Sequence, residues 1–255
     1  MTTKLIDIVR SASNLMLSDT FDVSQKDGFA NIVTSSDLAV QEFLKCELAK
    51  LLPGSGFLCE EEDKHDLTHE YTWIIDPIDG TANYSRGIGQ CAICVGLKHH
   101  EEMVDAVVYL PRTNELFTAS KGRGAFLNGK QIHVSDRPFQ DAILQTALSV
   151  YHKEHARVCS EIIVDAFMQC NDIRRFGAAA PEICYVAMGR CEMFFEYILS
   201  PWDYAAASLI LKEAGGMLCN LEGNSPDFIS STGLIVANTQ SNLDALLSIV
   251  KKHNA

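Results

Sequence analysis

Asp76 and Asp79 are two carboxylates three residues apart, with the carbonyl of Ile78 between them. Carboxylate and carbonyl oxygens are the ligands that a hard divalent cation such as Mg²⁺ prefers. Gly80 and Thr81 follow, and they predict the start of a helix, whose unpaired N–H groups can hold phosphate. Asp and Gly are also common turn residues, so this segment alone fits either a cation site or an acidic loop.

A short apolar run precedes the two aspartates. Trp73, Ile74 and Ile75 form a β-prone segment that predicts a buried strand. Pro77 cannot donate a hydrogen bond to a sheet, so we expect the strand to end at Asp76 and the chain to turn there.

The match to a known pattern is longer than the aspartate pair. Residues 76–84 (DPIDGTANY) resemble in full the first signature of the inositol monophosphatase family. Residues 201–207 (PWDYAAA), running on to 213–216 (EAGG), resemble its second signature. The resemblance extends from about Leu5 to Val250 and implies the family fold, an α/β (α+β) five-layer αβαβα sandwich. It also implies one domain over 1–255, with an N-terminal half to about residue 140 and a C-terminal half from about 141.

The periodicity of apolar residues agrees with mixed helices and strands. It predicts helices at 5–16, 38–51, 154–168, 179–188, 203–214 and 241–252, and strands at 57–59, 73–76, 91–98, 103–109, 115–119, 142–149, 172–176, 193–196, 217–219 and 234–237. Residues 31–37 are expected to form a polar hinge, and Asn128-Gly129 predicts a hairpin turn. The strands between 91 and 119 should form an antiparallel meander, and the second half should pack as α/β layers.

Composition limits the classes of function. The chain has 255 residues, 47% hydrophobic and 21% charged, with a net charge of −12. Such a charge argues against a nucleic-acid-binding face, which needs clustered Lys and Arg. We expect no membrane span, because no run approaches the ~18 apolar residues required. The nine scattered cysteines are expected to be reduced thiols of a cytoplasmic protein, and Cys91 and Cys94, in an apolar strand-like stretch, are expected to be core thiols.

The resemblance implies a metal centre of two Mg²⁺ ions. Glu60, Asp76 and the Ile78 carbonyl would hold the first ion. Asp76, Asp79 and Asp203 would hold the second, so that Asp76 bridges the pair. A third, weaker ion near Glu60 is also implied. Clustered carboxylates repel one another and need cations to neutralise them.

The residues themselves allow plainer interpretations of Glu60 and Asp203, and of a further acid, Asp37. Thr34 and Asp37 have capping-box spacing, which favours a helix cap at Asp37. An acidic run such as 60–63 is usually a solvated face. Asp203 fits the first turn of a helix, where the dipole favours an acid.

By the same resemblance, the reaction is hydrolysis of a phosphomonoester by a water that the ions activate. Asp37 and Thr81 would orient that water and take up its proton. The substrate would contact Asp79, Gly80, Thr81 and Asp203, together with the loop residues Gly177, Ala178 and Ala179 and the carboxylate of Glu196, which suits a polyol hydroxyl.

Two departures from the family pattern leave the substrate open. Ala178 stands where Ser or Thr is usual, and 88–90 (IGQ) lacks the usual Pro and aromatic residues. We expect inositol monophosphate. The alternatives are fructose 1,6-bisphosphate, a 3′-phosphonucleotide or NADP, with Arg174, Arg175 or Arg86 for a second phosphate. A silent scaffold that binds a protein partner is the alternative from another class. The resemblance also implies a homodimer.

Overall fold

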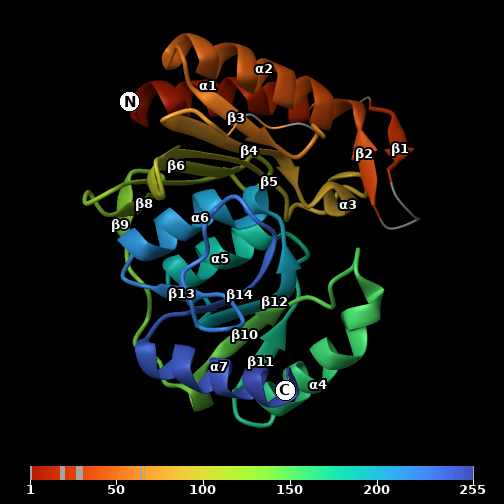
Figure 1. Cartoon of the computed structure of the whole chain (residues 1–255), viewed down its shortest axis with the longest axis vertical. Coiled ribbons are helices and arrows are strands. Elements are labelled where there is room, and N and C mark those ends of the chain that lie inside the picture. The colour runs from red at the N-terminus through yellow and green to blue at the C-terminus, as the bar shows by residue number, and fades with distance from the viewer. Residues whose placement is uncertain (1, 18–20, 27–30, 64, 66, 255) are drawn as a thin grey trace.

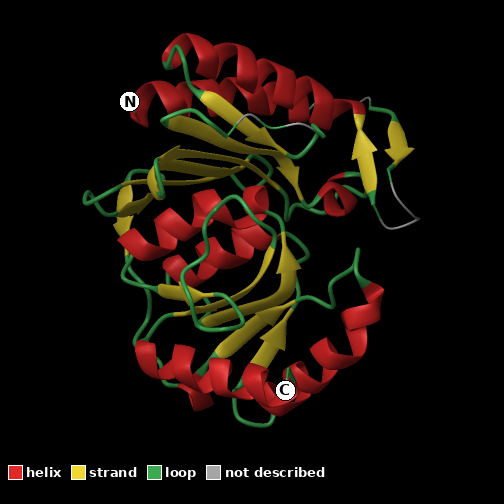
Figure 2. Ribbon diagram, viewed as in Figure 1, coloured by secondary structure: helices red, strands yellow, loops and turns green. Residues whose placement is uncertain are grey.

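Helices and two large β-sheets alternate in five layers through the structure, in the order helix, sheet, helix, sheet, helix (Figure 1, Figure 2). The computed structural model describes residues 2–17, 21–26, 31–63, 65 and 67–254. This arrangement confirms the expected αβαβα sandwich and brings segments from both halves of the chain together at one cavity.

A seven-stranded sheet forms the second layer, in the order β3-β4-β5-β6-β7-β8-β9. Its strands are β3 (Gly56–Cys59), β4 (Tyr71–Asp79), β5 (Ala92–His99), β6 (Glu102–Leu110), β7 (Glu115–Ser120), β8 (Ala125–Leu127) and β9 (Lys130–Ile132). The meander is confirmed, since every pair from β4 onward is antiparallel, whereas β3 and β4 are parallel. Helices α1 (Thr2–Met16) and α2 (Ser35–Leu51) cover the outer face (Figure 1).

A five-stranded sheet forms the fourth layer, in the order β11-β10-β12-β14-β13. Its strands are β10 (Ile143–Thr146), β11 (Asp172–Arg174), β12 (Met193–Leu199), β13 (Met217–Cys219) and β14 (Thr232–Ala237). Helices α5 (Ala179–Ala187) and α6 (Pro201–Glu213) lie between the sheets, and α4 (Ala156–Phe167) and α7 (Gln240–His253) cover the far face (Figure 1). Two 3₁₀ turns, Phe139–Asp141 and Lys153–His155, connect these elements.

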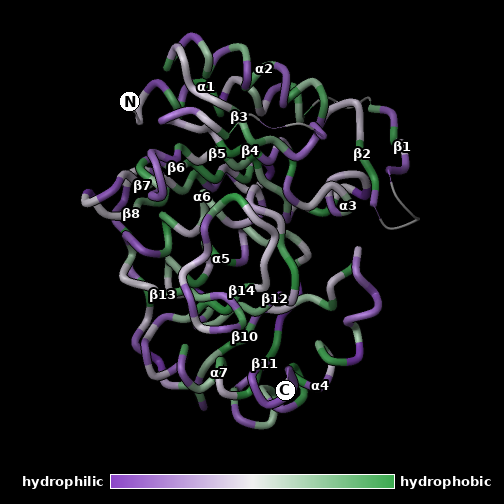
Figure 3. The backbone as a smooth tube through the Cα atoms, in the orientation of Figure 1, coloured by the Kyte–Doolittle hydropathy of each residue, from purple (hydrophilic) through white to green (hydrophobic). Residues whose placement is uncertain are grey.

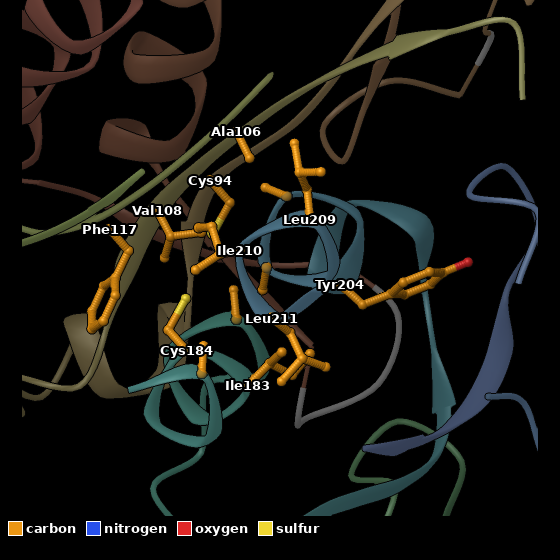
Figure 4. Close-up of a cluster of buried hydrophobic side chains, with 14 of the residues drawn as sticks. Cys94, Ala106, Val108, Phe117, Ile183, Cys184, Tyr204, Leu209, Ile210 and Leu211 are labelled. Atoms are coloured by element: carbon orange, nitrogen blue, oxygen red, sulfur yellow. The ribbon is translucent and has the colours of Figure 1, made fainter. Parts of the chain in front are cut away.

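Apolar side chains join the layers because each sheet face needs a partner to exclude water. Figure 4 shows Cys94, Val108 and Phe117 of the seven-stranded sheet pointing toward Ile210 of α6 and Cys184 of α5. In Figure 3 the strands are largely green and the outer helices mix purple with green, as expected of amphipathic covers. No helix among the described residues is long and apolar enough to span a membrane.

Strand β4 carries a bulge where the two aspartates stand. Asp76 pairs with Cys94 and Asp79 pairs with Ala92, so β4 has one residue more than β5 between these pairs. Residues three apart in a regular strand point to opposite faces, but the extra residue brings both aspartates to one face. Cys94 and Ala92 pack in the core around α5 and α6, so both carboxylates point to that side. The prediction that the strand ends at Asp76 is wrong, because Pro77 falls in the bulge, where no N–H is needed.

The polar hinge expected over 31–37 is also wrong. Residues Ile32–Thr34 form strand β2, which pairs antiparallel with β1 (Val23–Gln25), and α2 starts directly at Ser35. The strand predicted over 142–149 is shorter than expected, since β10 ends at Thr146. Residues 147 and 150–152 instead reach the cavity described next.

Candidate active site

One cavity of about 560 Å³ opens beside the ends of β3 and β4 and the starts of α5 and α6. Its walls include every predicted metal ligand and every predicted substrate contact: Glu60, Asp76, Ile78, Asp79, Gly80, Thr81, Gly177, Ala178, Ala179, Glu196 and Asp203. Asp37 does not line the cavity and lies fully buried behind Thr81.

Backbone geometry at Gly80 turns the chain sharply from β4 into the short helix α3 (Thr81–Tyr84). Gly80 has a φ of +85°, which is left-handed and unfavourable for other residues. A Cβ atom there would stand 2.9 Å from the Ala178 side chain and 2.9 Å from the Gln90 carbonyl oxygen. Only glycine therefore allows the first signature to approach the loop before α5 this closely.

Two helix starts hold aspartates at or beside the cavity. Asp203 is the third residue of α6, and its Oδ2 accepts the Ser200 N–H at 2.7 Å. Asp37 is the third residue of α2, and its Oδ2 accepts the Thr34 N–H at 2.8 Å. The plainer interpretation of Asp37 as a helix cap is therefore correct, but the cap uses only one of its two carboxylate oxygens.

The other oxygen of Asp37 contacts the first signature. The Thr81 hydroxyl lies 3.1 Å from Asp37 Oδ1 and 3.0 Å from the Ile78 carbonyl oxygen. Both side chains are buried. Burial raises the pKa of Asp37, while the hydrogen bonds from Thr34 and Thr81 lower it. Residues 44 positions apart in sequence thus form one hydrogen-bonded pair at the edge of the cavity.

Asp79 is held by the first turn of α5. Its two carboxylate oxygens accept the N–H groups of Ala179 at 3.2 Å and Ala180 at 2.6 Å. Burial raises the pKa of Asp79 to about 7, and these two hydrogen bonds oppose the rise. The helix start therefore compensates part of the charge that burial makes costly.

Glu60, Asp76, Asp79 and Asp203 form an acidic cluster. Asp76 is 1% exposed, and its Oδ1 has no hydrogen-bond partner among the described residues. Burial raises the pKa of Asp76 well above its usual range, and the charges of Glu60, Asp79 and Asp203 add to the effect. Burial likewise raises the pKa of Asp203, followed by repulsion from Asp79 and Glu60. A buried, unpartnered carboxylate oxygen among like charges is what a divalent cation would satisfy.

Sequence reasoning missed Lys26, whose Nζ lies 3.2 Å from Glu60 Oε1 and 2.5 Å from Glu61 Oε1. This cation neutralises part of the acidic run from the side of β1 and β2. Burial raises the pKa of Glu61 to about 7, and Glu60 adds to the rise. No motif in the sequence marks Lys26, because only the fold brings it to the site.

Two further residues that sequence reasoning missed hold the loop before α5. Glu182 is 2% exposed, and its Oε1 accepts the N–H groups of Phe176 at 2.6 Å and Gly177 at 2.7 Å. Asn83 donates to the carbonyl oxygens of Gln90 and Phe176, each at 2.7 Å. The position of Glu182 in the first turn of a helix can be recognised in the sequence, because acids are common there. Its burial cannot be recognised in the same way.

Glu196 enters the cavity from β12, and burial raises its pKa to about 8. Repulsion from Glu182 and Asp79 adds to this rise, and Arg175 opposes it. Of the three arginines considered for a second phosphate, Arg86 and Arg175 line the cavity, whereas Arg174 pairs with Asp172 at 2.5 Å.

Comparison with known proteins identifies the family of this chain. The model of the inositol monophosphatase family matches residues 1–255. The chain belongs to the inositol monophosphatase family. A curated relative, the Nus factor SuhB of Xylella fastidiosa, is 36% identical over 225 residues, which cover 86% of this chain and 81% of the relative.

Solved structures share the family fold with this chain. The extragenic suppressor protein suhB of Bartonella henselae is 31% identical, with a TM-score of 0.89 and coverage of 98% of both chains. The IMPase of Thermotoga maritima is 30% identical, with a TM-score of 0.86 and coverage of 98% of this chain and 96% of the other. An IMPase/NADP phosphatase solved with Mg²⁺ and phosphate is 24% identical, with a TM-score of 0.85 and coverage of 97% and 92%, and supports the fold alone.

Proposed function

We propose that the protein is a Mg²⁺-dependent phosphomonoesterase that hydrolyses a small polyol phosphate, with inositol monophosphate as the expected substrate. The acidic cluster is the observation that carries the proposal, above all the buried Asp76 oxygen without a partner among the described residues. Buried carboxylates without partners lower the stability of the folded protein. A scaffold that only binds a partner would have no need for them.

Two Mg²⁺ ions fit the donor set. Glu60, Asp76 and the Ile78 carbonyl would hold one ion, and Asp76, Asp79 and Asp203 the other, with a weaker third ion near Glu60. When bound, Mg²⁺ supplies charge stabilisation for the phosphoryl group and lowers the pKa of water. The raised carboxyl pKa values support this assignment, because they mean that the ionised carboxylates of the buried cluster are destabilised unless a positive charge lies nearby.

Asp37 and Thr81 would act together on the attacking water. Asp37 Oδ1 accepts the Thr81 hydroxyl proton in a hydrogen bond, which leaves the Thr81 oxygen free to accept a hydrogen bond from water. The pair orients the water and takes up its proton, as a general base does. Because Asp37 is fixed by its cap and Thr81 by the start of α3, the pair needs no rearrangement to do this.

The phosphate would lie against the backbone N–H groups of Gly80 and Thr81 at the start of α3. The rest of the substrate would contact Gly177, Ala178 and Ala179 and donate a hydroxyl hydrogen bond to Glu196. Glu182 positions that loop by holding two of its N–H groups.

A second candidate is a phosphatase for fructose 1,6-bisphosphate, a 3′-phosphonucleotide or NADP. The presence of Arg86 and Arg175 in the cavity wall favours it, because a second phosphate needs a positive partner. A phosphate-release assay with Mg²⁺ on inositol monophosphates and these three substrates tests both candidates. The first requires the fastest turnover on an inositol monophosphate, and no Mg²⁺-dependent release from any substrate would refute both.

The name of the SuhB relatives, Nus factor, favours a separate partner-binding role beside catalysis. The variant Asp79→Asn separates catalysis from partner binding, because it should abolish most of the phosphate release while a partner-binding surface stays intact. We also propose a homodimer in a reducing cytoplasm. The nine cysteines, all free thiols, support the reducing compartment.

A further inference from the structure

Glu70, His99 and His100 gather where β4 begins, at the end of the strand away from Asp76. The Nε2 atom of His99 lies 3.0 Å from Glu70 Oε1, and the Nε2 atom of His100 lies 4.0 Å from the same oxygen. One ligand atom from each of the three residues fits within 4.8 Å of the others. Neither the proposed reaction nor the family resemblance assigns these residues a role.

The backbone explains why two consecutive histidines face one carboxylate. Consecutive residues of a strand point to opposite faces. His99 is the last residue of β5 and pairs with Tyr71, but His100 leaves the strand with a left-handed φ of 52°. The His100 N–H still donates to the Glu70 carbonyl oxygen at 3.0 Å. The turn therefore swings the His100 side chain to the side of His99 while the backbone stays tied to the start of β4.

Ring packing also limits the orientation of His99. Its imidazole stacks on Tyr71, with ring centroids 4.3 Å apart and an interplanar angle of 13°. The ring of His100 lies 4.3 Å from that of His99, centroid to centroid. The Nε2 atoms of His99 and His100 therefore both lie near the same Glu70 oxygen.

Two imidazoles and one carboxylate are a donor set for Zn²⁺ and similar transition ions. Imidazole nitrogen is a preferred ligand of Zn²⁺, whereas Mg²⁺ favours oxygen. Tetrahedral zinc with bonds of ~2.0–2.2 Å separates its ligand atoms by roughly 3.3–3.6 Å. The separations from Glu70 Oε1, 3.0 Å to His99 Nε2 and 4.0 Å to His100 Nε2, lie on either side of this range. We propose that Glu70, His99 and His100 bind one Zn²⁺ ion, with water as the fourth ligand. The site would be distinct from the acidic cluster, since Glu70 lies six residues before Asp76, or about 20 Å along a strand.

A zinc ion here would connect the start of β4 to the turn between β5 and β6. It would stabilise the folded chain by mass action, because the unfolded chain does not hold the three ligands together. It would leave phosphate release unchanged, because none of the three residues lines the active-site cavity.

Calorimetric titration of the full chain with Zn²⁺, in excess Mg²⁺ to occupy the acidic cluster, tests the proposal. We expect one Zn²⁺ per chain and an affinity at least ~10-fold weaker in His100→Gln. His100 is 69% exposed at its side chain, so this variant should fold. His133→Gln, which changes an exposed histidine on another part of the surface, serves as the matched control and should bind like the wild type.

Equal affinity of the wild type and His100→Gln would overturn the site and leave only the hydrogen bond between His99 and Glu70. An equal loss in His133→Gln would also overturn it, because it would indicate nonspecific binding to surface imidazoles. Phosphate release measured on the same samples keeps the two proposals separate: its absence would refute the proposed function without affecting the zinc result.

Discussion

Thr81→Ala tests the proposed activation of water most directly. The substitution keeps the backbone N–H that faces phosphate and removes the hydroxyl that contacts Asp37 Oδ1 at 3.1 Å. General-base assistance contributes ~10²–10⁴-fold to rate, and each factor of ten equals about 1.4 kcal/mol of barrier. We therefore expect kcat to fall by about this factor, with little change in the Mg²⁺ concentration for half-maximal activity.

The cost to stability should be much smaller than the cost to rate. Thr81 is 7% exposed, and loss of one buried hydrogen bond typically costs about 1 kcal/mol. The variant should therefore fold, which thermal unfolding checks. Thr81→Ser is the matched control, because it retains the hydroxyl and should retain most of the activity.

The double variant Asp37→Asn, Thr81→Ala decides whether the two residues act as a unit. The amide introduced by Asp37→Asn keeps an oxygen to accept the Thr34 N–H, so the cap of α2 should persist. If the pair acts together, phosphate release by the double variant is scarcely slower than by either single variant. Losses that multiply would refute the paired role and leave Asp37 as a cap.

Three other predictions concern metal, substrate and pH. Asp79→Asn removes a charged ligand and should slow phosphate release by on the order of a thousandfold or more in a folded protein; near-normal turnover at saturating Mg²⁺ would contradict the ligand set. Glu196→Gln should slow turnover of inositol phosphate more than that of a small generic phosphoester, and equal losses would make Glu196 structural. The folded pKa values of about 7 for Asp79 and about 8 for Glu196 lie above the ordinary carboxyl value near 4, so the folded state binds more protons between these limits. The free energy of unfolding of the metal-free protein should therefore fall as pH rises from about 5 to about 8. Mg²⁺ should raise the Tm more at the upper end of this range. Thermal unfolding with EDTA or with Mg²⁺ measures both effects.

Local sequence patterns predicted most elements because they depend on periodicity. Helices α1, α5 and α7 and the strands of the meander lie within a few residues of their expected bounds. The signal at Asn128-Gly129 correctly gave the hairpin between β8 and β9, since both residues adopt the left-handed conformation that the turn needs.

The errors arise where partners distant in sequence decide the local structure. The bulge in β4 exists only because β5 offers one residue fewer between the paired positions, so no rule about Pro77 alone could reveal it. Strand β2 forms because β1 pairs with it, although 31–37 as a whole looks polar. In the same way, Lys26 and Glu182 reach the site through folding, and only the family resemblance pointed to Asp37 and Thr81 as neighbours.

The extra residue in β4 also places the Ile78 carbonyl outside the regular pairing with β5, and no side-chain substitution can remove that main-chain oxygen. Changing the Ile78 side chain leaves its carbonyl in place, so conventional mutagenesis cannot assess a backbone ligand. Deletion of Pro77 would restore regular pairing of this part of β4 with β5, and the two aspartates would then be two residues apart and still share a face. The shortened strand would keep both carboxylates, but the Ile78 peptide would take part in the regular hydrogen bonding of the sheet. Comparing cation binding by this variant and by the wild type would therefore measure the contribution of the single Ile78 carbonyl.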